Sequence, residues 1–261
     1  TAAGKSVIAG EFIRGLMQTW PGQRVLLLTH VKELIAQNYE KLMTLWPDAP
    51  AGIYSAGLKR RDTDHDIIFA GIQSVHKRAT EIGHIDLIII DECHLVPKKG
   101  MGMYLRFLKS MSVINSKIRV VGLTATPYRL NSGPLIDGDD RIFTDIAYDV
   151  DVMQLVNDGY LSPLVPKAMD NEFDLSEINT RAGDYKTDQL HALTDNDALA
   201  RMVLVEILAY GRQRKSWLIF CTGVNHAEKM ATIIAEHGIT TATITGATPT
   251  DERDYILERF K

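Results

Sequence analysis

An aliphatic run that ends in two acids is the feature that most constrains this fold. Residues 87–90 read Leu-Ile-Ile-Ile and are followed directly by Asp91 and Glu92. Four consecutive aliphatic residues suit a strand that is buried on both faces, as strands of parallel sheets are. Open α/β sheets bind ligands at the carboxyl ends of such strands, where these two acids would lie. Taken alone, the run is equally consistent with a strand followed by a solvated turn.

The N-terminal residues supply a partner for these acids. Gly4-Lys5-Ser6 matches the end of a phosphate-binding loop, and a helix is predicted to follow it. In such a loop, backbone N–H groups at the helix start hold phosphate, and we expect Ala3 and Val7 to take part. The rest of the loop pattern and its preceding strand lie before residue 1, so we expect the sequence to be a fragment.

The residue types at these positions fit one chemistry, the binding and hydrolysis of a nucleoside triphosphate with Mg²⁺. Mg²⁺ takes one or two carboxylates together with phosphate oxygens, which predicts Asp91 and the Ser6 hydroxyl as its ligands. Lys5 would reach the outer phosphates. Glu92 would orient or deprotonate the attacking water. The predicted cofactors are therefore ATP and Mg²⁺.

Three further apolar segments, at residues 25–28, 67–71 and 118–123, are predicted strands that also end in polar residues. Hydroxyls, amides and cations at such positions commonly contact a phosphodiester backbone, although an N-cap or an ordinary strand-to-helix turn explains them equally well. Two hydroxyls after the third strand can hydrogen-bond the turn at the acids. The candidate nucleic-acid contacts are Thr29, His30, Lys32, Gly71, Gln73 and Ser74, and the two hydroxyls are Thr124 and Thr126.

Composition restricts the class of protein. With 261 residues, 45% of them hydrophobic, the chain can form two modest domains. The net charge of −4 argues against binding nucleic acid over the whole surface, so any such contact is expected to be local. Cys93 and Cys221 each adjoin an apolar strand, which favours reduced thiols over a disulfide or a zinc site. The sequence shows no apolar run of membrane-spanning length and no signal peptide, so we expect a cytoplasmic location without membrane contact.

The second part of the chain has its own pattern of elements. In the first part of the chain, the basic run at residues 56–61 is expected to be a solvated loop, with nucleic-acid contact as the weaker alternative. Asn225 is a plausible N-cap. The expected elements are a helix over 146–161 with Val152, Leu155 and Val156 inward, a linker over 161–169, helices over 196–212, 225–237 and 253–260, a strand over 216–221 and a β-rich segment over 240–245.

Five motifs occur in a family order and spacing. Gly-Lys-Ser, Thr-His-Val-Lys-Glu-Leu, Gly-Ile-Gln-Ser-Val, Asp-Glu-Cys-His and Leu-Thr-Ala-Thr-Pro resemble motifs I, Ia, Ib, II and III of superfamily 2 helicases of the DEAD/DEAH-box type. Within that superfamily, residues 29–37, 56–61 and 246–260 are similar to bacterial RadD-type DNA repair helicases and related phage proteins.

The resemblance implies an α/β fold of two tandem RecA-like P-loop NTPase lobes, each with a mainly parallel sheet flanked by helices. It implies a first lobe over residues 1–166 and a truncated second lobe over 167–261, with ATP in the cleft between them. His94 would link the metal acids to the second lobe, where Thr222 and Gly246 would contact DNA. Motifs V and VI lie beyond residue 261, so we expect this fragment itself to be a poor ATPase and no helicase.

The function that follows is an ATP-dependent helicase or translocase acting on single-stranded or junction DNA, in DNA repair or phage replication. Two alternatives stay open. One is the motor subunit of a restriction system. The other is a folded module that binds nucleotide and DNA without turnover. Protein partners are not specified by the sequence.

Overall fold

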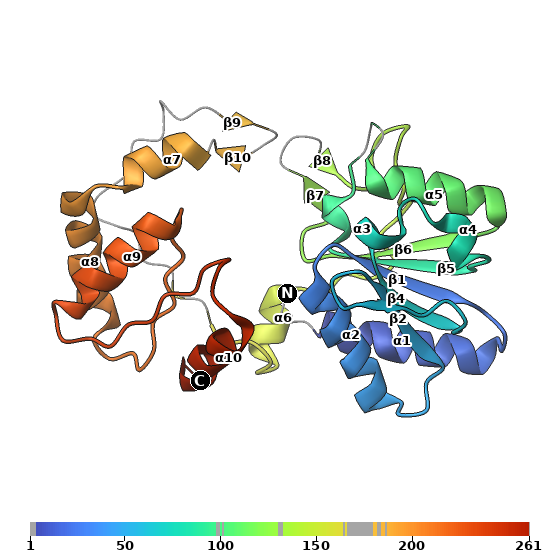
Figure 1. Ribbon diagram of the computed structural model, residues 1–261, viewed down its shortest axis with the longest axis horizontal. Helices are drawn as coiled ribbons and strands as arrows, with labels where there is room; N and C mark the ends of the chain where they lie inside the picture. The colour runs from blue at the N-terminus through green and yellow to red at the C-terminus, as the bar shows by residue number, and fades with distance from the viewer. Residues whose placement is uncertain are drawn as a thin grey trace. The chain divides into compact units, whose positions relative to one another are not determined.

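The chain divides into two compact units, Thr1–Leu164 and Val165–Lys261, and each is described by itself (Figure 1). The computed structural model describes residues 4–97, 100, 102–129, 133–163, 165, 180–181, 184–185 and 187–260. Ala3 and most of the predicted linker over 161–169 lie outside the described residues. The assignment of the two units as helicase lobes stays a prediction.

The first unit is built on a six-stranded sheet in the order β3-β2-β4-β1-β5-β6. Its three central strands are aliphatic and fully buried, and they pair in parallel. Only β3 runs antiparallel to its neighbour. The sheet therefore confirms the predicted α/β class. The strands are β1 (Val25–Thr29), β2 (Ala51–Ser55), β3 (Arg60–Arg61), β4 (Ile67–Gly71), β5 (Leu87–Asp91) and β6 (Arg119–Leu123).

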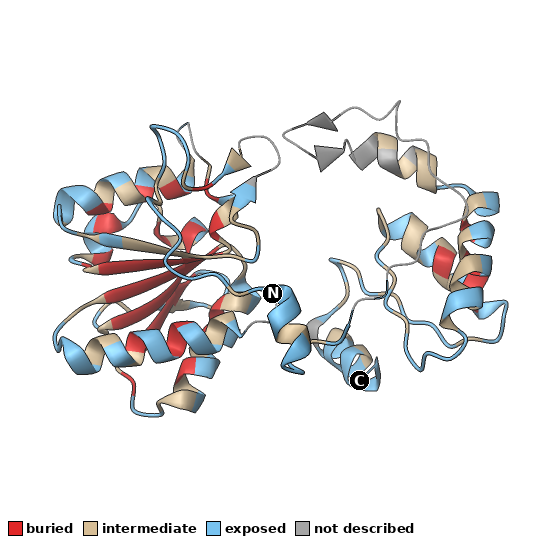
Figure 2. Ribbon diagram, turned by 180° about the vertical axis from the view of Figure 1, so that it is seen from behind, coloured by how far each residue is buried: buried red, intermediate tan, exposed pale blue. Residues whose placement is uncertain are grey.

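Helices cover both faces of this sheet, because the alternating side chains of each strand build two separate cores. On one face Leu27 packs in a cluster with Ile13 of α1 and Ile35 of α2. On the other face Leu28 belongs to a cluster with Phe107 of α5. Figure 2 shows the buried residues concentrated in the strands between these layers. The helices are α1 (Lys5–Thr19), α2 (Lys32–Leu45), α3 (Ile72–Val75), α4 (Ala79–Ile82) and α5 (Met103–Ile114).

At the edges of this sheet the strand predicted over 118–123 was confirmed, and two other strands were missed. The strand predicted over 118–123 is an edge strand, and β6 is only partly buried because no strand covers its outer side. Strands β2 and β3 were not predicted, because Gly52 and the flanking Pro50 are typical of a turn and the arginines of a loop. Gly52 is used in β2 for close packing, since a Cβ there would lie 2.6 Å from Asp62 Cβ.

The last helix of the first unit is shorter than predicted. Helix α6 (Val152–Asn157) begins where the Asp151 carboxylate accepts a hydrogen bond from the Met153 N–H, which fixes the helix start. Val152 was expected to face inward, but it is 54% exposed because it lies in the first turn beside this cap. Leu155 and Val156 are half-buried.

The second unit has a small helical core. Ala200 and Leu204 of α8 pack against Met230 and Ile233 of α9. Asn196 caps α8 through its side-chain oxygen, but α9 is preceded by Gly223 and not, as predicted, by Asn225. The elements are β9 (Thr180–Arg181), β10 (Asp184–Tyr185), α7 (Thr187–Thr194), α8 (Asp197–Gly211), α9 (Val224–Ala235) and α10 (Thr250–Phe260).

The two strands predicted for this unit are not formed. Residues 216–221 and 240–245 pair with no other described segment, and a strand requires a hydrogen-bonded neighbour. Side-chain exposure still alternates along the first segment, since Trp217, Ile219 and Cys221 join the core whereas Leu218 and Phe220 are exposed. The prediction of a strand over 216–221 was therefore wrong about the backbone pairing, although the side chains alternate in exposure as those of a strand do.

Two absences predicted from composition concern membrane contact and disulfides. Among the helices in the described part of the chain, none combines the length and apolar character needed to span a bilayer. Cys93 is buried and Cys221 half-buried, and neither forms a disulfide. Burial raises the pKa of the Cys221 thiol.

Candidate nucleotide and nucleic-acid sites

The candidate phosphate loop leads directly into α1. Gly4 caps this helix with φ 71° and ψ 31°, a left-handed conformation that glycine adopts without strain. The Gly4 carbonyl accepts hydrogen bonds from the N–H groups of Val7 and Ile8. The Val7 N–H, which we expected to hold phosphate, is thus used within the helix. The first-turn N–H groups before it can still face an anion, since helix starts leave such donors without intrahelical partners.

Strand β5 ends in a sharp turn that aims Glu92 back toward α1. Glu92 has φ 52° and ψ 49°, a conformation that costs a residue with a side chain about 1–2 kcal/mol. Its Oε1 lies 2.5 Å from Lys5 Nζ, and both side chains are largely buried. Strained backbone of this kind persists where the surrounding structure fixes it, often at functional sites. Two residues far apart in sequence are thus held in one ion pair.

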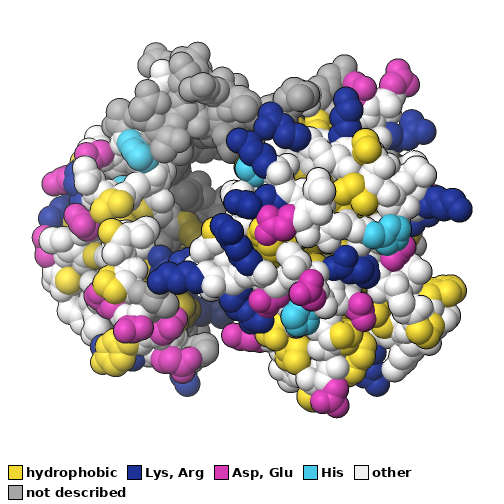
Figure 3. Space-filling model, turned by 45° about the vertical axis from the view of Figure 1, so that its right-hand side comes forward, with side chains coloured by type: hydrophobic (Ala, Val, Ile, Leu, Met, Phe, Trp, Pro, Cys, Tyr) yellow, Lys and Arg dark blue, Asp and Glu magenta, His cyan; other side chains and the backbone are white. Residues whose placement is uncertain are grey.

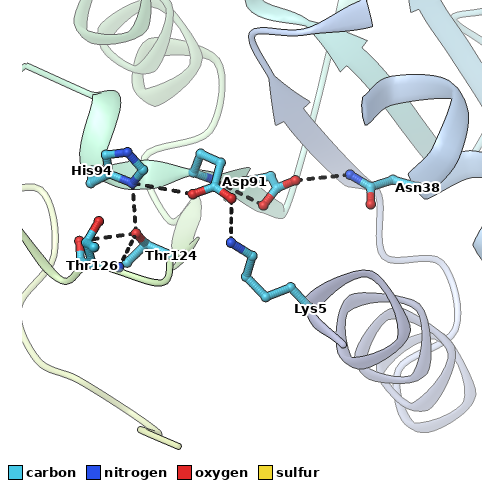
Figure 4. A network of polar contacts seen from close by, with 7 residues as sticks. Lys5, Asn38, Asp91, His94, Thr124 and Thr126 are labelled. Carbon is cyan, nitrogen blue, oxygen red and sulfur yellow. Dashed lines mark hydrogen bonds and ion pairs between the residues drawn. The ribbon is translucent and has the colours of Figure 1, made fainter. Parts of the chain in front are cut away.

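The Asp91 carboxylate is buried and held by two donors. Asp91 is 7% exposed, and its Oδ1 accepts a hydrogen bond from the Glu92 N–H at 3.0 Å. Its Oδ2 accepts one from Asn38 Nδ2 of α2 at 3.2 Å (Figure 4). Each carboxylate oxygen has a further lone pair, so the group can still bind a cation or its water.

His94 connects the acids to the strand end of β6. Its Nδ1 lies 2.9 Å from Thr124 Oγ1 and 3.4 Å from Glu92 Oε2. The Thr124 hydroxyl donates to the Thr126 carbonyl and accepts from the Thr126 N–H (Figure 4). The predicted hydrogen bond of these threonines to the acid turn is therefore made through His94, and the Thr126 contacts use its backbone.

A cavity of about 330 Å³ opens between the loop and the acids. A lysine, hydroxyl and carboxylate oxygens, and a helix start suit a nucleotide phosphate with Mg²⁺, which prefers oxygen ligands. The described residues contain no cluster of three or more His, Cys, Asp or Glu side chains, so the chain's carboxylates and hydroxyl would share the ion with phosphate. The cavity is lined by Gly4, Lys5, Ser6, Val7, Leu34, Asp91 and Glu92.

The polar residues after β1 and β4 are joined to each other. Gln73 Nε2 donates to the His30 carbonyl at 2.7 Å, and Ser74 Oγ accepts from the Ala56 N–H at 2.9 Å. Gly71 allows close packing, because a Cβ there would lie 3.2 Å from Ile35 Cδ1. These contacts bring the two predicted nucleic-acid segments to one edge of the sheet.

Burial separates two neighbouring candidates for nucleic-acid contact. Lys32 is exposed at the start of α2. Thr29 is 0% exposed, and its hydroxyl and His30 Nδ1 are both buried atoms without a hydrogen-bond partner. The Thr29 side chain therefore does not reach the surface, where we expected it to contact nucleic acid.

A second cavity, of about 430 Å³, lies beside Gln73 and Ser74 and is basic. Arg78 donates to Glu81 at 2.9 Å, and Tyr54 donates to the other Glu81 oxygen at 2.5 Å. The hydrogen bonds from Tyr54 and Arg78 hold the pKa of Glu81 below its usual value. Glu81 therefore neutralises Arg78. The cavity is lined by Tyr54, Ala56, Arg61, Gln73, Ser74, His76, Lys77 and Arg78.

The two arginines of β3 have different surroundings. Arg60 is 2.5 Å from Asp62 and lies over the Tyr39 ring at 5.3 Å. Arg61 lines the basic cavity, and it forms no ion pair with any described residue, as also holds for Lys77. Successive side chains of a strand point to opposite faces, which explains the difference. On the face drawn in Figure 3, Lys and Arg side chains form several groups with acids between them.

The candidates in the second unit belong to a separate network. Thr222 Oγ1 lies 2.7 Å from Thr194 Oγ1 and 3.2 Å from His226 Nδ1, while the Thr222 carbonyl is hydrogen-bonded by His191. Burial lowers the pKa of His226. A Cβ on Gly246 would meet open space.

Asn38, Arg61 and Lys77 are the residues that sequence reasoning missed or left aside. Asn38 had a readable signal, because it occupies the buried face of α2 together with Ile35 and Leu42. A polar residue at an apolar position of a helix indicates a buried partner. Arg61 could not be distinguished from Arg60 by sequence, because the pairing of β3 decides which of the two side chains lines the cavity.

Comparisons with known proteins agree with the motifs. Residues 1–129 match the family described as "Type III restriction enzyme, res subunit". The chain is 27% identical over its whole length to a protein of Saccharomyces cerevisiae named as a candidate ATP-dependent helicase, IRC3, of which it covers 38%. It is 24% identical to the corresponding candidate mitochondrial helicase of Schizosaccharomyces pombe, with 100% of this chain and 43% of that protein covered.

A 51.5 kDa protein of a Lactococcus phage is 24% identical over 99% of this chain and 50% of its own length. The chain thus spans half or less of these relatives. Among solved structures, the UvsW helicase of bacteriophage T4 is 19% identical with a TM-score of 0.40, covering 48% of this chain and 44% of that one. The Escherichia coli DExH-box NTPase HrpB is 13% identical with a TM-score of 0.47, covering 93% and 27%.

The family match over residues 1–129 and the helicase relatives support the resemblance to superfamily 2 helicases that the five motifs indicated. The narrower RadD-type resemblance is not among these findings.

Proposed function

We propose that this chain is the ATP-binding part of a DNA helicase or translocase. The observation that carries the proposal is the convergence of Lys5, Asp91 and Glu92, which lie at one cavity although 87 residues separate Lys5 from Glu92. Two relatives are named as candidate ATP-dependent helicases, which supports the same assignment. DNA repair or phage replication is the setting that we propose for it.

Each residue at the first cavity has a role that follows from its geometry. Lys5 would exchange its Glu92 partner for the outer phosphates, which frees the Glu92 carboxylate to accept a proton from the attacking water. Asp91 and Ser6 would hold Mg²⁺, which when bound neutralises charge on the phosphates. His94 and Thr124 would sense this exchange, because His94 contacts the same Glu92 side chain.

The second cavity would hold the sugar-phosphate backbone of DNA. Arg61 and Lys77 supply positive charge there, and Ser74 is a polar lining residue of the kind that positions a phosphodiester chain. Thr29 would act through its backbone and not its side chain. Such contacts carry little sequence information, which suits a protein that moves along a strand. In the second unit, Thr222 and Gly246 remain proposed DNA contacts.

The motor subunit of a restriction system is a second candidate. The description of the matched family favours it. The motor chemistry would be the same, and a nuclease or methylase activity in the full-length protein would distinguish this candidate from a repair helicase.

The test is DNA-stimulated ATP hydrolysis by the full-length protein. Wild-type turnover should rise on addition of single-stranded DNA, and Lys5→Ala and Glu92→Gln should each abolish it. Unchanged turnover in either variant would overturn the assignment of this cavity. Endonuclease activity dependent on ATP would move the assignment to the restriction candidate.

A further inference from the structure

Asn38 is an unexpected residue at its position in α2. It is 5% exposed, and the buried residues on either side of it along the same helix face are Ile35 and Leu42. Asparagine is a poor residue for a helix interior because its side chain competes for backbone hydrogen bonds. Burying an amide among aliphatic side chains also requires that it find a hydrogen-bond partner. Asn38 therefore departs from the residue types that a buried helix interior favours, and such departures are common at functional sites.

The partner of Asn38 is the proposed metal carboxylate. Its Nδ2 donates to Asp91 Oδ2 at 3.2 Å, and the contact is buried. The other Asp91 oxygen is held by the neighbouring Glu92 N–H. With one donor on each oxygen, the plane of the carboxylate is fixed, while a lone pair on each oxygen remains available (Figure 4).

A second buried polar atom lies on the same face of the sheet. Thr29 follows Leu28, which pairs with Ile90, so Thr29 and Asp91 occupy neighbouring register positions on β1 and β5. The Thr29 hydroxyl is buried without a hydrogen-bond partner. Thr29, Asn38 and Asp91 are thus three buried polar residues on the side of the sheet that α2 covers.

Helix α2 also begins beside the proposed DNA contacts. It starts at Lys32, directly after the His30 carbonyl that accepts the Gln73 hydrogen bond. Asn38 is six residues further along, or about 9 Å at the rise of an α-helix. A helix moves as a rigid element, so a shift of its first turn on contact with DNA also moves the Asn38 amide relative to Asp91.

We propose that Asn38 is a positioning residue that orients the Asp91 carboxylate for Mg²⁺ and ties that orientation to α2. The inference rests on the proposed nucleotide site. Removing a hydrogen-bond partner behind a metal ligand typically costs about 10–100-fold in metal affinity. A purely structural asparagine would affect folding stability alone.

The experiment measures binding of N-methylanthraniloyl-ATP to the full chain as MgCl₂ is titrated. Asn38→Leu keeps the side-chain size and removes the donor, and Asn38→Ser keeps a polar group that is too short to reach Asp91. Both should raise the half-saturating Mg²⁺ concentration at least about 10-fold, with binding in EDTA unchanged. Asn115→Leu is the matched control, because it removes an asparagine amide that donates at 2.9 Å to the Ile85 carbonyl.

A folded variant at Asn38 whose Mg²⁺ half-saturation stays within about twofold of wild type would overturn the positioning role. Two variants are used so that failure of one to fold still leaves a result. If the proposed nucleotide site is wrong, the wild-type protein will show no Mg²⁺-dependent binding of the analogue. If only the role of Asn38 is wrong, the wild-type protein will bind the analogue with Mg²⁺, and the Asn38 variants will bind it equally well.

Adding an oligothymidylate strand tests the link to α2. In the wild-type protein the oligothymidylate should change the half-saturating Mg²⁺ concentration. A ligand that moves α2 binds with different affinity to the two positions of this helix, and the difference is passed on to the Mg²⁺ site. In Asn38→Leu this change should disappear. A wild-type value that does not respond to the strand, or a response that survives in Asn38→Leu, would overturn the link.

Discussion

The two cavities of the first unit differ in how their charges are satisfied. At the nucleotide cavity, Lys5 is already paired with Glu92, and the neighbouring Asp91 is held by two hydrogen bonds. At the basic cavity, only Arg78 is neutralised, while Arg61 and Lys77 form no ion pair with the described residues. The first site must exchange partners when a ligand binds, and the second attracts an anion directly.

This difference predicts opposite consequences for removing an acid. At the first cavity the acid competes with phosphate for Lys5, yet it also takes part in the proposed chemistry. At the second cavity the acid Glu81 only reduces the positive charge. The predictions below test that contrast, beginning with the largest expected effect.

Lys5→Ala and Glu92→Gln should separate binding from hydrolysis. Glu92→Gln releases Lys5 for phosphate, so affinity for the nucleotide analogue should be equal or tighter, whereas hydrolysis by the full-length protein should fall about 10²–10⁴-fold. Lys5→Ala should lose both. Fluorescence titration and steady-state turnover measure the two quantities, and weaker nucleotide binding by Glu92→Gln would contradict the proposed exchange.

Thr124→Val should have a smaller effect at the same cavity. The substitution keeps the side-chain shape and removes the hydroxyl that contacts His94, a hydrogen bond worth about 1 kcal/mol, or about fivefold in turnover. Nucleotide affinity should stay at the wild-type value. A change in affinity without a change in turnover would show that His94 does not respond to the reaction at Glu92.

Arg61→Ala and Arg60→Ala form a matched pair on one short strand. Arg61 lines the basic cavity and Arg60 is paired with Asp62, so only Arg61→Ala should weaken single-stranded DNA binding. Loss of one phosphate contact should reduce the slope of log affinity against log salt by about 0.7 for a single strand. Fluorescence anisotropy over a salt series checks this, and equal slopes for the two variants would remove Arg61 from the site.

Glu81→Gln is expected to give the smallest effect and the opposite sign. It frees Arg78 from its ion pair, so DNA affinity should rise slightly and the salt slope should steepen. Glu11→Gln is the control, because Glu11 forms an i, i+3 pair with Arg14 on α1, away from the cavity lining. If Glu81→Gln weakens DNA binding, Arg78 depends on Glu81 for its position.

The sequence indicated the residues that line the first cavity better than those that line the basic cavity, for a physical reason. Asp91 and Glu92 follow a run of aliphatic residues that predicts a buried strand. Their position at the carboxyl end of that strand follows from sheet geometry. The difference between Arg60 and Arg61 depends on the pairing of β3 with β2, a contact that no periodicity reveals. Asn38 is an intermediate case. The sequence shows that it lies on the apolar face of a helix, but it does not show that Asp91 is its hydrogen-bond partner.

The second unit shows the limit of pattern reading more plainly. Residues 216–221 have the apolar composition of a strand, and their side chains alternate in exposure as in a strand, with Ile219 in the core and Phe220 exposed. Alternation reports which side chains are covered, whereas a strand also needs a paired backbone. Helices α8, α9 and α10 were predicted because their hydrogen bonds are internal to each segment. Helix α7 was not predicted, because it lies in a polar stretch with little periodicity.

The most direct test of the central claim measures both ligands on two variants of the full chain. Lys5→Ala should lose Mg²⁺-dependent binding of the nucleotide analogue and keep its affinity for single-stranded DNA. The double variant Arg61→Ala/Lys77→Ala should do the reverse. If both variants lose the same ligand, or if neither loses any, the two cavities are not separate nucleotide and DNA sites and the account is contradicted.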